Sequence, residues 1–244
     1  MSDYAASTYG DQIADVYDDL YPPPADLSTA VSFLKDFAGS GPALELGIGT
    51  GRFALPLCAT GVDVHGIDAS AAMVSKLRAK PGGDRIPVTA ADFSKFDLGK
   101  RYRLIYVVFN TFFGLLTQDA QVTCFQSVAR NLDDGGAFVL EAFVPDPSRF
   151  DRGQRVSVTS LGTDSVQLEV SQHSAISQRA QSYHVIMSDD RVRLYPVNVR
   201  YAFVSELDLM ARIAGLRLRE RWANWDRSPF GDGAAKHISV WERT

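Results

Sequence analysis

Over the first 145 residues, short apolar runs alternate with segments in which apolar residues recur every three or four positions. The runs are bounded by Gly, Pro or Asp, as buried strands commonly are. They lie at 42–46, 62–67, 86–90, 104–109 and 137–143, with helical periodicity at 53–59, 71–79 and 118–132. This order of strand, helix and strand predicts βαβ units, and therefore a parallel sheet covered by helices.

The pattern changes after Pro145. From 155 to 203, apolar residues alternate with polar ones, which predicts three or four antiparallel strands inserted into the α/β unit. A helix is expected over 205–215, ending at a glycine. Two closing strands, 216–225 and 237–241, then complete the chain.

Composition narrows the class of protein. The chain has 244 residues, 45% of them hydrophobic, and a net charge of −4. That composition fits one large globular domain with an insertion, and an acidic chain is a poor binder of nucleic acid. The start shows no signal peptide, and no run approaches a membrane span. Two cysteines form neither a disulfide framework nor a zinc site, so we expect a cytoplasmic protein.

The most informative segment is Leu44-Glu-Leu-Gly-Ile-Gly-Thr-Gly51, which lies between a strand and a helix. Glycines there let a ligand approach the backbone, and the helix N-terminus carries partial positive charge. The dinucleotide fingerprint G-x-G-x-x-G is not met, because position 52 is Arg. Asp68 follows Gly47 by 21 residues, where an acid can accept hydrogen bonds from a ribose diol. Both dinucleotide and adenosyl cofactors use that device.

The segment Glu45-Leu-Gly-Ile-Gly-Thr-Gly51 resembles the E/D-x-G-x-G-x-G loop of class I S-adenosylmethionine-dependent methyltransferases. The resemblance covers about residues 12–143 and the last two strands. It implies a Rossmann-like, seven-stranded, mostly parallel sheet with helices on both faces, plus an antiparallel β insertion after strand five. Further matches, in the family's order, are His65-Gly-Ile-Asp68, Ala69-Ser-Ala-Ala-Met73, Ala91-Asp92-Phe93 and Leu132-Asp-Asp-Gly-Gly136, the last with Asp134 in place of the usual proline.

The resemblance implies S-adenosylmethionine as cofactor and S-adenosylhomocysteine as product. Glu45 would orient the loop backbone or receive the amino group, and Asp68 would bind the ribose hydroxyls. Asp92 would accept from the adenine amine, with Phe93 beside it. The full implied cofactor set is Tyr21, Glu45, Gly47, Gly49, Gly51, Arg52, Asp68, Ala69, Met73, Ala91, Asp92, Phe93 and Phe109.

The N-terminal segment carries three closely spaced tyrosines around an acidic run. The phrase Ala14-Asp-Val-Tyr-Asp-Asp-Leu-Tyr21 looks like the start of bacterial methyltransferases that act on amino groups of nucleotide-linked deoxysugars. By that resemblance Tyr17 and Tyr21 lie near cofactor and substrate, and Tyr9 contacts substrate. The implied parts are a helical lid over 1–40, a core over 41–144 and 204–244, and an insertion over 145–203 that forms substrate cavity or dimer contact.

Several residues are candidates for the chemistry. A histidine can take a proton near neutral pH, so His184 and His173 join Tyr17 as catalytic candidates. Asn110 follows strand four, at the usual edge of the acceptor pocket. The [D/N]-P-P-[Y/F] motif of amino-directed DNA methyltransferases is incomplete there, which disfavours that class.

Two arginines follow strand five, at the sheet edge where open α/β sheets bind ligands. Arg149 and Arg152 would clamp a diphosphate if the substrate carries one. Glu169 and His173 have the spacing of a helical metal pair, but they fall in a predicted strand, so no metal is expected.

The expected activity is methyl transfer to a nitrogen or oxygen of a small molecule in bacterial specialised metabolism. Expected partners are that acceptor and a second copy of the chain, with neither nucleic acid nor membrane. Two alternatives stay open at this point. One is an NAD(P)-dependent oxidoreductase, and the other is a binding module for an adenosyl cofactor that lacks catalysis.

Overall fold

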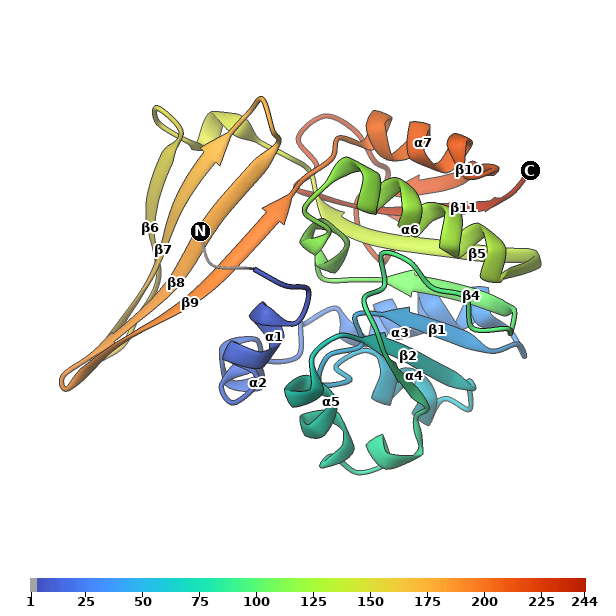
Figure 1. The fold of residues 1–244 in the computed structure, drawn as a ribbon, viewed down its shortest axis with the longest axis horizontal. Coiled ribbons are helices and arrows are strands. Elements are labelled where there is room, and N and C mark those ends of the chain that lie inside the picture. The colour runs from blue at the N-terminus through green and yellow to red at the C-terminus, as the bar shows by residue number, and fades with distance from the viewer. Residues whose placement is uncertain (1–3) are drawn as a thin grey trace.

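The computed structural model describes residues 4–244, and a seven-stranded sheet forms its centre (Figure 1). The strand order is β10-β11-β5-β4-β1-β2-β3, and β11 alone runs antiparallel to its neighbours. The order reverses between β1 and β4, which makes a crevice at their carboxyl ends. The bounds are β1 (Ala43–Leu46), β2 (Val64–Asp68), β3 (Val88–Ala90), β4 (Tyr102–Val107), β5 (Leu132–Phe143), β10 (Leu216–Trp222) and β11 (Lys236–Arg243).

Helices cover both faces of this sheet, as the sequence predicts. On one face, α3 (Leu27–Ala38) and α4 (Ala54–Ala59) bury a cluster that includes Phe33 and Trp225. On the other, α6 (Gln118–Asn131) and α7 (Val204–Ile213) pack with Trp241. The central strands are buried on both sides, which is why their sequences read as nearly continuous apolar runs.

Three helices and three short turns complete the α/β body. Helix α1 (Thr8–Ile13) packs on α5 (Ala71–Arg78), and α2 (Tyr17–Leu20) follows it; we call residues 4–26 the lid. A small cluster of Ile13, Ala14, Met73 and Tyr195 joins the lid to both neighbours. The 3-10 turns are η1 (Gly83–Arg85), η2 (Thr111–Gly114) and η3 (Pro147–Arg149). No helix within residues 4–244 is long and apolar enough to cross a bilayer.

The insertion is a separate antiparallel sheet of four strands in the order β6-β7-β8-β9. It projects from the α/β body, and the lid lies in the angle between the two (Figure 1). Its inner face meets the lid through Tyr195 and Ile186. The bounds are β6 (Gln154–Leu161), β7 (Ser165–Ser174), β8 (Arg179–Ser188) and β9 (Arg191–Arg200).

Two predicted strand boundaries are wrong. Strand β4 ends at Val107, because Phe109 and Asn110 turn into the left-handed region with φ of 57° and 62°. Strand β5 begins at Leu132 and not at 137, because Leu132 already pairs with Tyr102 of β4. The Asp-Asp-Gly-Gly segment then interrupts the register, and pairing resumes at Ala137.

Candidate active site

A cavity of about 510 Å³ opens at the carboxyl ends of β1, β2 and β4. The glycine loop and the end of β2 form its floor. The lid covers one side, and β8 and β9 of the insertion form the opposite wall. Because parallel strands all end at this edge, their terminal residues meet around one ligand-sized space.

The glycine loop leaves its backbone open to that space. Gly47 has a φ of 70°, and a Cβ there would collide with the Thr111 side chain. The loop therefore needs glycine both for its conformation and for the close approach of η2.

Asp68, at the end of β2, is held with its carboxylate toward the cavity. Its Oδ2 accepts from the Gly49 N–H at 2.7 Å and its Oδ1 accepts from the Ser70 N–H at 2.8 Å. Burial raises the pKa of this carboxyl above its ordinary value, although the two N–H donors oppose the shift. The group is thus fixed in orientation and can still accept from a ligand hydroxyl.

Glu45 lies beneath the loop and is only 3% exposed. Its Oε2 accepts from the Tyr106 hydroxyl at 2.9 Å, and burial raises the pKa of this carboxyl to about 8. Glu45 does not line the cavity, so the structure places it where it supports the loop from below.

Aromatic side chains of the lid meet the residue that follows the glycine loop. The Arg52 guanidinium donates to the Tyr17 hydroxyl at 2.6 Å and lies 4.0 Å from the Phe109 ring centroid. Tyr21 packs edge-on against Phe109 at 5.4 Å, and its hydroxyl is 2.7 Å from His184 Nε2. The lid, the cofactor loop and the insertion therefore converge on one aromatic cluster.

The lid is docked by polar contacts along α5 and the loop. Asp11 accepts from the Ser70 hydroxyl at 2.7 Å, while Asp18 accepts from Thr50 at 2.7 Å and pairs with Lys80 at 2.7 Å. Gly10 lies against the first turn of α5, and a Cβ there would be 2.6 Å from the Ser70 Cβ. The helices approach so closely only because this position has no side chain.

Comparison with known proteins decides between the two cofactor classes that the glycine loop leaves open. A family model described as a methyltransferase domain matches residues 43–136. The structure of the CcbJ methyltransferase from Streptomyces caelestis is 41% identical, covers 99% of this chain and 100% of its own, and superposes with a TM-score of 0.93. The chain belongs to the class I S-adenosylmethionine-dependent methyltransferases.

Two further relatives share the whole length of this methyltransferase. The cypemycin N-terminal methyltransferase of a Streptomyces species is 27% identical over 100% of both chains. The sugar N-methyltransferase KedS8 from a Streptoalloteichus strain is 20% identical, with a TM-score of 0.68 over 100% of this chain and 99% of its own. The latter likeness shows a common fold, including the insertion.

The site suits the methyltransferase cofactor, S-adenosylmethionine. The open backbone at Gly47 and Gly49 would admit the methionine part, and Asp68 would accept from the ribose hydroxyls. Asp92 and Phe93 line the cavity and would meet the adenine. When bound, the cofactor supplies a methyl group on positively charged sulfur.

Most residues singled out from the sequence line this cavity. Glu45, Gly51, Arg52 and Ala91 lie outside the lining, in the layer that supports it. The lining includes, from the predicted set, Tyr9, Tyr17, Tyr21, Gly47, Gly49, Asp68, Ala69, Met73, Asp92, Phe93, Phe109, Asn110 and His184.

His173, predicted as a catalytic candidate, does not line the cavity. Its ring stacks on Phe150 with centroids 4.5 Å apart, and its Nε2 is 2.8 Å from the Tyr201 hydroxyl. His184 pairs with Glu169 of β7, and His173 follows Glu169 by four residues on the same strand. His173 therefore shares a sheet face with His184 but lies nearer the α/β body. Two aromatic rings hold it outside the cavity lining.

Arg149 and Arg152, predicted to clamp a diphosphate if the substrate carries one, do not line the cavity either. Both side chains are exposed on the connection between β5 and β6, and neither lines the cavity. The chain leaves the end of β5 through η3 toward the insertion, which carries these residues away from the crevice.

Sequence reasoning missed several lining residues. Tyr4 reaches the insertion, where its hydroxyl accepts from the Asn198 N–H at 3.4 Å. The alternation in β9 marked Val197 and Val199 as one face of a strand, but nothing local showed that this face meets the cavity. The missed residues include Tyr4, Thr111, Leu115, Leu116, Phe143, Val197, Asn198 and Val199.

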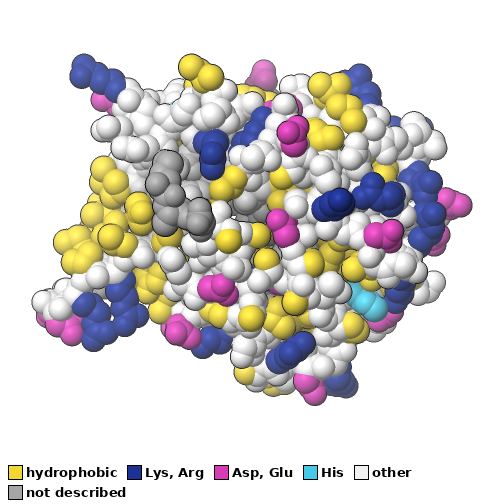
Figure 2. Space-filling model, viewed as in Figure 1, with side chains coloured by type: hydrophobic (Ala, Val, Ile, Leu, Met, Phe, Trp, Pro, Cys, Tyr) yellow, Lys and Arg dark blue, Asp and Glu magenta, His cyan; other side chains and the backbone are white. Residues whose placement is uncertain are grey.

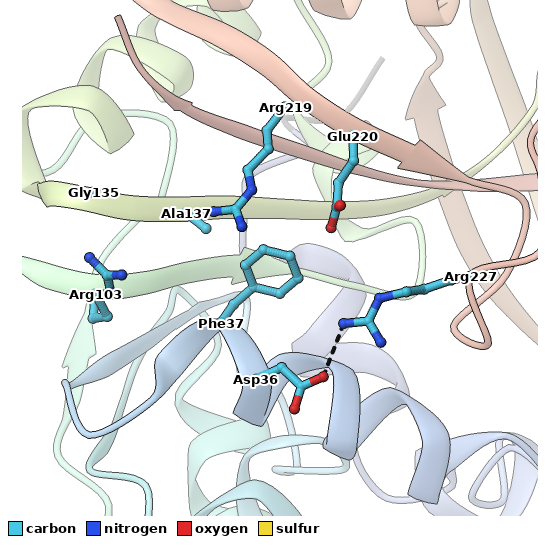
Figure 3. Close-up of a pocket in the computed structure, with 8 residues that line it drawn as sticks. All are labelled: Asp36, Phe37, Arg103, Gly135, Ala137, Arg219, Glu220 and Arg227. Atoms are coloured by element: carbon cyan, nitrogen blue, oxygen red, sulfur yellow. Dashed lines mark hydrogen bonds and ion pairs between the residues drawn. The ribbon is translucent and has the colours of Figure 1, made fainter.

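A second hollow of about 200 Å³ lies near the opposite edge of the sheet, where β4 and β5 begin (Figure 3). Two of its arginines are already paired, with Arg227 3.0 Å from Asp36 and Arg219 3.6 Å from Glu242. It takes no part in the site above. Among residues 4–244 there is also no group of three His, Cys, Asp or Glu side chains that could hold a metal.

Proposed function

We propose that this methyltransferase transfers the methyl group to a nitrogen or oxygen of a small molecule in bacterial specialised metabolism. The observation that carries the proposal is the shape of the site: the lid and the insertion close a largely apolar cavity over the cofactor loops. A cavity of about 510 Å³ between the lid and the insertion suits a small acceptor beside the cofactor. The sugar N-methyltransferase KedS8 acts on nitrogen by name, which favours nitrogen.

The chain's own residues need to do little beyond alignment. Methyl transfer is an in-line displacement with a good leaving group, so positioning and exclusion of water supply much of the catalysis. Phe109 and Tyr21 exclude water at the meeting point of lid and loop, and Asn110 borders the acceptor side. A proton leaves the acceptor, and a base beside the cavity would take it.

His184 is suited to hold that proton. Burial lowers the pKa of His184 below its ordinary value, so its imidazole is neutral near pH 7 and can accept. Its Nε2 faces the Tyr21 hydroxyl at 2.7 Å, which can relay the proton from the cavity. Glu169, the nearby carboxylate, opposes the shift.

We expect His184→Gln to lower the turnover number by about tenfold, less than most general-base effects because water can replace the imidazole. In the wild type the rate should fall as pH drops through the lowered pKa of His184, and this acid limb should vanish in the variant. His173→Gln is the matched control, since that ring lies outside the cavity. An unchanged pH–rate profile in His184→Gln would exclude the role.

The proposal is tested by screening acceptors for release of S-adenosylhomocysteine. The panel should contain primary and secondary cyclic amines, nucleotide-linked aminodeoxysugars and phenols. We expect turnover with an amine, and mass spectrometry then locates the added methyl group. Tight cofactor binding with no turnover of any member would favour the binding module without catalysis.

We also propose that the enzyme is a homodimer through the outer face of the insertion. Figure 2 shows apolar side chains gathered over this sheet, and Val156 is 68% exposed and Leu161 75%. The paired strands give three apolar rows across the sheet, a face without charge that suits an identical face of a second copy. The rows are Val156–Val170–Tyr183–Pro196, Val158–Leu168–Val185–Leu194 and Leu161–Val166–Met187–Val192.

The face is large enough for this purpose. Four strands and three rows cover roughly 500 Å² on each copy. Two copies would bury about 1,000 Å², the lower end of a stable interface. We expect light scattering to give twice the 26.7 kDa chain mass for the wild type. The double variant Val158→Lys, Leu194→Lys should give the mass of one chain. Ile176→Lys, at a fully exposed position in the β7–β8 turn, is the control. A monomeric wild type at micromolar concentration would contradict the dimer.

A further inference from the structure

The turn that follows β4 is held in a conformation that its own residues do not favour. Phe109 and Asn110 are consecutive left-handed residues, with φ of 57° and 62°. Asparagine tolerates this region, but a phenylalanine there has its Cβ crowded against the backbone. Such a turn persists only where the surrounding structure fixes it.

The fixing group comes from β5. The Glu141 Oε2 accepts from the Phe109 N–H at 2.6 Å, and the Glu141 carbonyl oxygen accepts from the Asn110 N–H at 3.4 Å. Asn110 in turn uses its Oδ1 to accept from the Phe143 N–H at 2.7 Å. One residue of β5 thus meets two successive amides of the turn.

Glu141 is itself placed deep in the protein. It is 8% exposed, and its partner on the other side is Lys236, whose Nζ lies 3.6 Å from Oε1 and 3.0 Å from Asp26. The hydrogen bond from the Phe109 N–H to Glu141 is 2.6 Å long, whereas the Lys236 Nζ lies 3.6 Å from the carboxylate. The Phe109 amide is therefore the closer partner of Glu141.

The turn presents two residues to the site. Phe109 lines the cavity, lies 4.0 Å from the Arg52 guanidinium and packs edge-on against Tyr21 of the lid. Asn110 also lines the cavity. A change in the backbone at this turn would move both, together with the aromatic contact between the lid and the cofactor loop.

We propose that Glu141 is a positioning residue of methyl transfer, whose carboxylate locks the left-handed Phe109–Asn110 turn and so sets the wall between cofactor and acceptor. It touches neither substrate and acts through the backbone of Phe109. This proposal rests on the proposed function only where it is tested by turnover of an acceptor.

Two conservative variants distinguish this role from a role in neutralising the charge of Lys236. Glu141→Gln keeps an oxygen at the right reach and loses the charge, whereas Glu141→Asp keeps the charge and is one methylene too short. We expect the Asp variant to lose about tenfold in turnover number and the Gln variant to stay within about threefold of wild type. Calorimetric affinity for S-adenosylhomocysteine should change by less than about threefold in both. If Glu141 serves only to balance Lys236, the order of the variants reverses.

Hydrogen exchange gives a readout that needs no acceptor. We expect peptides covering 107–113 to exchange about tenfold faster in Glu141→Asp, with wild-type protection in Glu141→Gln and in the control Lys236→Met. Equal protection in the Asp and wild-type proteins would overturn the proposal, whatever the acceptor screen shows. If the Asp variant does not fold, lost protection in Glu141→Gln overturns it instead. Failure of the acceptor screen alone would count against the proposed function and leave this measurement standing.

Discussion

Asp68→Ala is expected to weaken binding of S-adenosylhomocysteine by about 100-fold or more. The carboxylate would accept two ribose hydroxyls, and hydrogen bonds to a charged group contribute about 1.5–3 kcal/mol each. The same carboxylate holds the Gly49 and Ser70 N–H groups, so the loop also loses its orientation. Isothermal calorimetry measures the affinity.

The fold should survive this change, because Asp68 lines a cavity where water can reach the freed amides. Asp68→Asn is the matched control, since it keeps one acceptor oxygen and should fall between wild type and alanine. Circular dichroism checks folding of each variant. An affinity in Asp68→Ala equal to that of the wild type would refute the ribose contact.

Gly10→Val is expected to lower turnover by about 10- to 100-fold, the effect of forcing extra atoms into a packed contact. A Cβ at Gly10 would lie 2.6 Å from Ser70 Cβ and 3.1 Å from Met73 Cγ. Ser70 cannot yield easily, because its hydroxyl caps α5 by accepting from the Met73 N–H. The lid would therefore lift from α5 and expose the cavity to water.

The measurement pairs steady-state turnover with hydrogen exchange of residues 8–20, which should lose protection. Gly231→Val is the control, since a Cβ there has open space around it. Gly10→Val with wild-type turnover and an undisturbed lid would show that the close approach is unimportant.

The site residues that could be predicted from the sequence lie in short motifs at the ends of predicted strands. The glycine loop and Asp68 follow adjacent strands, so spacing along the chain already brings them to one edge of the sheet. Alternation placed His184 and His173 in the inserted strands. It could not show which of them meets the lid, because the lid residue Tyr21 comes from the other end of the chain.

The turn at Phe109 shows why other features stay hidden. The apolar run continues through Val108 and Phe109, so local pattern extends the strand to 109. What ends it at Val107 is the carboxylate of Glu141, 32 residues away in the chain. Arg149 and Arg152 lie outside the cavity lining because nearness in sequence to the end of β5 does not give the direction in which η3 leaves.

The separation of the two sheets has a consequence for how such enzymes diverge. His184, Val197 and Asn198 line the cavity from a sheet that shares no strand pairing with the one carrying Asp68. Substitutions in the segment 154–200 can therefore reshape the choice of acceptor with little effect on cofactor affinity. Grafting that segment between homologues offers a direct route to new methylated products, and natural selection has the same route open to it.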